Sequence, residues 1–201
     1  MSLKRLVTKT KYIQAKELYK EASICYIRSY YILLNPSDYH GVIESMQHCF
    51  ELSLKSLWLV VGLTYPSTHD AGKKIEKITN RYNKILPNLD FELWAKIEEW
   101  IRTKSEYMAD LHHKTIYGDE DNNIPASKLF SEKEMRDIIR NVSMFHTFIK
   151  GPIQWIGNAL NLLTDEERLD LERKVQQANL ILSNPQKFKE IRKKIDEFFV
   201  L

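Results

Sequence analysis

Two residues with complementary chemistry lie six positions apart in the sequence, Arg140 and His146, and Asn141 directly follows the arginine. An imidazole can move a proton to or from a hydroxyl group, and a guanidinium can stabilise the charge of a phosphorane. Around one phosphate these two groups could act together, and Asn141 could orient either of them. The three residues are therefore a candidate catalytic site.

Helical geometry leaves a second interpretation of this pair open. Positions 140 and 146 are about 120° apart on a straight helix, which disfavours convergence within one chain but permits it across a two-fold dimer. His146 also falls beside an apolar stripe. A half-buried histidine held by hydrogen bonds is therefore the alternative to a catalytic one.

A second polar group stands at the predicted start of a helix, where His69 and Asp70 are followed one turn later by Lys73 and Lys74. The free N–H groups of a helix N-terminus bind phosphate, and the two lysines would add positive charge. The structural alternative is a cap, in which Asp70 or Thr68 accepts hydrogen bonds from those N–H groups.

The remaining charged residues do not predict a metal or cofactor site. Glu51 and Lys55 are spaced as an ordinary helix ion pair, and His112 and His113 diverge by about 100° on a helix. The sequence has no His-Glu-x-x-His, Cys-x-x-Cys, glycine-rich dinucleotide or Walker pattern. We therefore expect no metal and no cofactor. The acidic run at 119–121 predicts a solvated loop, with a cation or a basic partner as the alternative.

Composition limits the elements that position these residues. The chain has 201 residues with only 6 Gly and 6 Pro, about half the average usage. Few turns mean long elements, so an all-α protein is predicted and an all-β sandwich is excluded. The hydrophobic fraction of 43% and charged fraction of 28% exclude a disordered chain.

Charge and hydropathy point to a protein of the cytoplasm. The formal net charge is +3, with cations concentrated in residues 1–30, 73–84 and 187–194. These stretches predict solvated helix faces, with an RNA- or phosphate-facing surface as the alternative. Two cysteines make no disulfide framework. No apolar run is long enough to span a membrane, and cations interrupt the start of the chain.

Apolar stripes with helical spacing predict five long helices. They cover about 8–34, 39–61, 70–86, 91–113 and 131–150, with Pro87 ending the third and Asp90 capping the fourth. The pair Gly151-Pro152 predicts the strongest break in the chain. Beyond it, two or three short helices form a C-terminal extension, whose last helix is predicted to bury Phe188, Ile191, Ile195 and Phe198.

Two segments carry short motifs whose order and spacing match those of a known family. The first is Glu51-x-x-x-Lys55-x-Leu57, followed by Val61-Gly62 and Pro66-x-x-His69-Asp70. The second is the loop Tyr117-Gly118-Asp119 with Pro125 after it, where the arginine that often precedes the family's loop is missing. In these motifs the sequence resembles the HEPN domain family (higher eukaryotes and prokaryotes nucleotide-binding), and the resemblance covers about residues 12–150.

The resemblance implies an up-and-down helical bundle at 1–150, followed by an extension at 151–201 that packs on the bundle or on a partner. It also implies a homodimer that binds a nucleotide or RNA, in some relatives with a nucleotidyltransferase partner of a toxin–antitoxin pair. The phosphate-binding candidates are His69, Asp70, Lys73, Lys74, Tyr117 and Asp119.

Two alternatives remain for the function. Many members of the family are metal-independent endoribonucleases with an arginine and a histidine separated by four to six residues, and Arg140, Asn141 and His146 fit this spacing. The other alternative is a structural dimerisation scaffold. The exposure of Arg140 and His146, and their convergence in a cleft, would separate a ribonuclease from a binding protein.

Overall fold

The computed structural model describes residues 6–34, 38–85 and 91–198, and within these ranges the regular structure is helical. No strand forms in the described chain, and an isolated bridge joins Asp119 to Ile124. The predicted all-α class is therefore confirmed. The helices are α2 (Lys9–Ile32), α3 (Tyr39–Val60), α4 (Glu76–Ile85), α5 (Phe91–Tyr117), α6 (Ala126–Leu129), α7 (Glu132–Leu160), α8 (Asp165–Leu182) and α9 (Pro185–Phe198).

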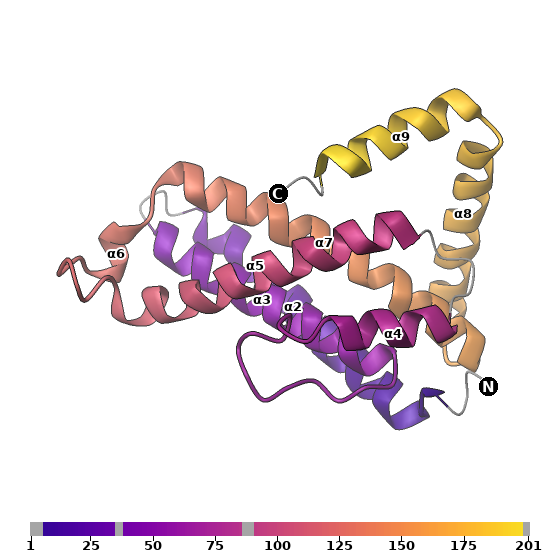
Figure 1. Ribbon diagram of the computed structural model, residues 1–201, viewed down its shortest axis with the longest axis horizontal. Coiled ribbons are helices and arrows are strands. Elements are labelled where there is room, and N and C mark those ends of the chain that lie inside the picture. The colour runs from indigo at the N-terminus through magenta and orange to yellow at the C-terminus, as the bar shows by residue number, and fades with distance from the viewer. Residues whose placement is uncertain (1–5, 35–37, 86–90, 199–201) are drawn as a thin grey trace.

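The bundle is organised around α3. Helices α2 and α3 form an antiparallel hairpin, α7 packs against both, and α5 packs against α3 (Figure 1). Nearly every apolar side chain of α3 is buried because neighbours cover this helix on several sides. The interior includes Tyr12, Ala15, Met46, Phe50, Leu54, Leu57, Trp100, Ile101, Val142, Phe145 and Ile149.

Several helix ends form through local sequence signals. Ser131 and Thr164 each build a complete capping box at the starts of α7 and α8. Asn184 accepts hydrogen bonds from two backbone N–H groups at the start of α9. Gly62 follows α3 with φ 82°, and a Cβ there would lie 1.9 Å from the carbonyl oxygen of Leu6. Only glycine fits this position without strain.

The predicted helix break at Gly151-Pro152 is wrong. Helix α7 continues through Pro152 to Leu160. A proline inside a helix costs about 3 kcal/mol, but the apolar stripe of α7 continues through it, and Ile153 and Ile156 beyond the proline are buried. Each buried isoleucine contributes about 1.5–3 kcal/mol, which outweighs the cost of the proline. The predicted division into 1–150 and 151–201 therefore falls within a helix.

The third predicted helix begins later than the sequence indicated. The described α4 starts at Glu76, and residues 71–75 form turns. Gly72 is held against α5, where an added Cβ would lie 2.4 Å from the Cβ of Ser105. Residues 71–75 therefore pack closely on α5 as turns, where the sequence predicted the first helical turn. The predicted helix stop Pro87 and cap Asp90 lie outside the described residues.

The extension is less buried than predicted. Helix α8 packs on α7. Within the described chain, α9 packs chiefly on α8. Phe188 is 42% exposed and Ile191 is half-buried, so the predicted burial of the last helix is wrong for these two. The side chains of Ile195 and Phe198 lie outside the described ones.

No helix in the described part of the chain combines the length and apolar character needed to cross a membrane.

Candidate functional site

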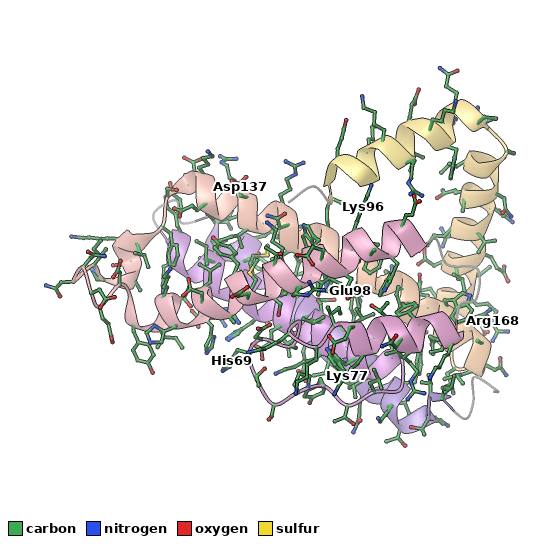
Figure 2. All side chains as sticks on the ribbon, viewed as in Figure 1. His69, Lys77, Lys96, Glu98, Asp137 and Arg168 are labelled. Carbon is green, nitrogen blue, oxygen red and sulfur yellow. The ribbon has the colours of Figure 1, made fainter. Side chains whose placement is uncertain are left out.

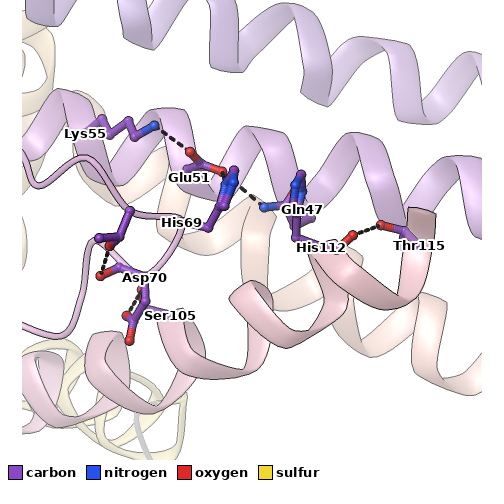
Figure 3. A network of polar contacts seen from close by, with 9 residues as sticks. Gln47, Glu51, Lys55, His69, Asp70, Ser105, His112 and Thr115 are labelled. Atoms are coloured by element: carbon purple, nitrogen blue, oxygen red, sulfur yellow. Dashed lines mark hydrogen bonds and ion pairs between the residues drawn. The ribbon is translucent and has the colours of Figure 1, made fainter. Parts of the chain in front are cut away.

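A polar network joins α3, the loop at 61–75 and α5 (Figure 3). We call it the α3–α5 site and define it by Gln47, Glu51 and Lys55 of α3, His69 of the loop, and His112 of α5. The three α3 residues are spaced four apart and therefore lie on one face of the helix. Figure 2 shows His69 on the loop that precedes α4.

Glu51 is the centre of this network. Its Oε1 accepts a hydrogen bond from Lys55 Nζ at 2.5 Å, and its Oε2 lies 3.1 Å from His69 Nδ1 and accepts from Gln47 Nε2 at 3.2 Å. Burial opposes ionisation of Glu51, but the hydrogen bonds from Lys55 and His69 outweigh it and lower the pKa of the carboxyl. The carboxylate is therefore ionised at neutral pH and holds Lys55 and His69 in place.

Two imidazoles form the outer part of the site. The rings of His69 and His112 stack with centroids 4.0 Å apart and an interplanar angle of 24°, and the ring of His48 lies 5.9 Å from that of His112. His112 Nδ1 lies 3.3 Å from Gln47 Oε1. Burial, with a smaller contribution from the neighbouring His69, lowers the pKa of His112. The side chain of His69 is 57% exposed, so a ligand can reach the stack.

Buried contacts fix the loop that carries His69. Asp70 Oδ1 accepts from the backbone N–H of Lys73 at 3.1 Å and from Ser105 Oγ at 2.9 Å. Ser105 Oγ in turn accepts from the N–H of Gly72, and Trp58 Nε1 donates to the carbonyl of Ala71 at 3.0 Å. Asp70 therefore caps the turn, and its carboxylate is occupied by the protein itself.

The predicted phosphate-binding residues divide between two places. His69, Asp70, Lys73 and Lys74 share the turn at the α3–α5 site, where both lysines are exposed. Tyr117 and Asp119 lie at the end of α5, about 18 Å along that helix from Ser105. Tyr117 contacts the ring of His113, and Asp119 accepts hydrogen bonds from Asn122 within its own loop. The structure does not bring these two groups into one site.

The candidate catalytic residues are also separated. Arg140 is exposed and Asn141 half-buried on α7, whereas His146 is only 7% exposed. His146 Nδ1 lies 2.9 Å from Ser53 Oγ, His146 Nε2 lies 3.0 Å from Ser23 Oγ, and the ring stacks on Tyr19. Burial lowers the pKa of His146 to about 4. The geometry therefore gives no support to the catalytic assignment of Arg140, Asn141 and His146.

A separate cavity of about 600 Å³ lies between α2, α7 and α8, and Ser23 lines it. Its charged side chains pair across the helices, with Lys16 Nζ 2.6 Å from Glu167 and Lys150 Nζ 3.3 Å from Asp170. Charges of both signs line the cavity in equal number. No class of ligand is favoured by this balance.

Sequence reasoning missed the participation of Gln47, His48 and His112. Gln47 precedes Glu51 by four residues, and His112 follows Ser105 by seven, so each spacing places its pair on one helix face. These spacings were available signals. They identify a site only when the contact between α3 and α5 is known.

The model of the HEPN domain family matches residues 13–151, about two thirds of the chain. The chain belongs to the HEPN domain family. No curated protein and no solved structure matches the sequence significantly. Membership in the HEPN family supports a function related to nucleotides or RNA in the broad sense. The match ends inside α7, so α8 and α9 lie outside the family's domain.

Proposed function

We propose that the protein is a HEPN binding module that takes a nucleotide or single-stranded RNA at the α3–α5 site. The observation that carries this proposal is the stack of His69 on His112, with centroids 4.0 Å apart, on a buried and ionised Glu51. A flat and accessible pair of imidazoles suits a nucleobase, because stacking on an aromatic ring contributes about 1–3 kcal/mol per base.

The charges around the stack suit a phosphate. Lys55 is held at Glu51, with its Nζ 5.4 Å from the centroid of the Tyr65 ring. Lys73 and Lys74 are exposed on the turn that begins at Asp70. A bound phosphate would meet these cations at the edge of the histidine stack. The backbone N–H of Lys73 is already bonded to Asp70, so side chains rather than the helix N-terminus would hold the phosphate.

We also propose that two copies associate through α2. Helix α2 and the turn that follows it carry four exposed apolar side chains spaced three and four residues apart, as in a coiled-coil seam. They are Ile24, Ile27, Tyr31 and Leu34, from 52% to 80% exposed. A second copy would cover this stripe symmetrically. Tyr31→Asp is expected to abolish that dimer in sedimentation velocity, and unchanged sedimentation would contradict it.

The geometry favours binding over RNA cleavage because His146 is enclosed and Arg140 is exposed elsewhere on α7. A nucleotidyltransferase-type partner and a toxin–antitoxin role stay predictions of the family resemblance. Co-purification of the tagged chain with the product of a neighbouring nucleotidyltransferase gene tests both.

The binding proposal is tested by fluorescence anisotropy with two probes, a labelled adenine nucleotide and a short labelled single-stranded RNA. His69→Ala and His112→Ala are each expected to weaken binding of the favoured probe about tenfold or more, because each removes half of the stack. Binding is also expected to weaken with added salt, since lysines contact the phosphate.

The matched control is His113→Ala, which changes the same residue type at the next position of α5, where the ring contacts Tyr117 instead. It is expected to bind as the unchanged protein does. Equal affinity of all four proteins for both probes would contradict the proposal, as would the absence of binding to either probe.

A further inference from the structure

The arm formed by α8 and α9 exposes several apolar side chains among the residues that the structure describes. Leu180 is 70% exposed, Leu169 58%, Val175 50% and Phe188 42%. Helix α8 repeats apolar residues at 171, 175 and 178, and α9 at 188 and 191, with the spacing of a coiled-coil seam. Both helices lie outside residues 13–151, the range that the family shares.

The connection between the two helices limits the area over which they cover one another. Ser183 ends α8, and Asn184 caps α9 through hydrogen bonds to the backbone N–H groups of Gln186 and Lys187. Figure 1 shows α9 turning away from α8 at this connection, so that the two helices form a V. Burial of the apolar stripes of α8 and α9 therefore requires another surface.

A pocket lies between α7 and α8. It has a volume of about 350 Å³ and opens beside the exposed stripe. Phe188 stands exposed at the start of α9, and buried aromatic anchors in pockets dominate the energy of interfaces. The pocket is lined by Asn158, Arg168, Leu171, Glu172, Val175 and Gln176.

The two helices carry opposite net charge. Helix α8 has five acidic and three basic residues, and α9 has five basic and three acidic residues. Glu172 is exposed at the pocket, and Lys187 and Lys189 flank Phe188. An α9 helix that seats Phe188 in this pocket brings its lysines toward the acidic side of α8.

We propose that α9 of one copy docks on α8 of a second copy, while α9 of the second docks on α8 of the first. The contact is reciprocal, as a two-fold dimer requires. It is separate from the α2 face and from the α3–α5 site. Its success or failure therefore leaves the proposed binding function untouched.

Sedimentation velocity on the full chain tests the exchange of arms. Phe188→Asp removes the anchor and Val175→Asp spoils the pocket, and each is expected to weaken this association about 10- to 100-fold. Gln186→Asp is the matched control, because it adds the same charge to α9 on the side opposite Phe188. It is expected to associate as the unchanged chain does. Circular dichroism confirms that each variant keeps its helices.

A mixture of the two variants identifies the partner. Phe188→Asp keeps an intact α8 and Val175→Asp keeps an intact α9, so an equal mixture restores one of the two dockings and is expected to recover association. A mixture that associates no more than either variant alone would overturn the proposal. The proposal would also be overturned if the unchanged chain sediments like Phe188→Asp. This includes the outcome in which the unchanged chain binds anionic lipid vesicles through Phe188 instead of a second copy.

Discussion

Acidification is expected to destabilise this HEPN protein through His146. Burial lowers the pKa of His146 from the ordinary 6.5 to about 4, and hydroxyl groups of Ser53 and Ser23 meet its two ring nitrogens at 2.9 and 3.0 Å. The unfolded chain takes up a proton there below about pH 6.5, whereas the folded chain does so only near pH 4. The contribution of His146 to stability is therefore complete above pH 6.5 and is lost as the pH falls toward 4.

The magnitude follows from the two pKa values. Each unit of difference is worth 1.36 kcal/mol, so the free energy of unfolding falls by about 3 kcal/mol across this window. Urea denaturation followed by tryptophan fluorescence, at several pH values from 7 to 4, measures it. Comparison with His146→Gln isolates the effect, because the glutamine does not titrate and the carboxylates contribute equally to both proteins.

The unchanged protein is expected to lose about 3 kcal/mol more than His146→Gln between pH 7 and pH 4. His113→Gln, which alters an exposed histidine, is expected to follow the unchanged protein across the whole range. Parallel curves for the unchanged protein and His146→Gln would refute the reasoning. They would mean that the folded protein protonates His146 as readily as the unfolded chain does.

Two further substitutions test the network and the bundle. Glu51→Gln leaves the half-buried Lys55 without its carboxylate and is expected to cost about 1–3 kcal/mol at pH 7. Because the folded pKa of Glu51 is lowered, this deficit should shrink as the pH falls through that pKa, and a deficit independent of pH in urea denaturation would contradict the account. Gly62→Ala places a Cβ 1.9 Å from the carbonyl oxygen of Leu6 at a φ of 82°. It is expected to cost about 1–3 kcal/mol, and an unchanged melting temperature would count against that geometry.

Local sequence signals predicted the helices of the bundle well. The apolar stripe at 39–61 corresponds to α3 at Tyr39–Val60, and the capping box at Ser131 starts α7. Both signals act within a few residues of chain, through helical periodicity and side-chain capping. Gly62 is a local signal of the same kind, since a glycine with a left-handed backbone immediately follows the helix.

Features that depend on contacts between helices were not predictable in this way. The local sequence pattern predicted that the helix ends at Pro152. Helix α7 continues past Pro152 because Ile153 and Ile156 are buried against the bundle. The α3–α5 site joins Glu51, His69 and His112, which are 18 and 43 residues apart in the chain. Helical spacing predicts on which face of its own helix each residue lies. It does not predict that α5 packs on α3, and this packing brings the ring of His112 onto that of His69.

The most direct test of the central claim is an NMR titration of the histidine side chains with the nucleotide or RNA that binds more tightly. The account predicts that the ring signals of His69 and His112 shift together with ligand concentration. The signals of His113, at the end of α5, and of the buried His146 are expected to stay in place. Binding that leaves the signals of His69 and His112 unmoved would contradict the account.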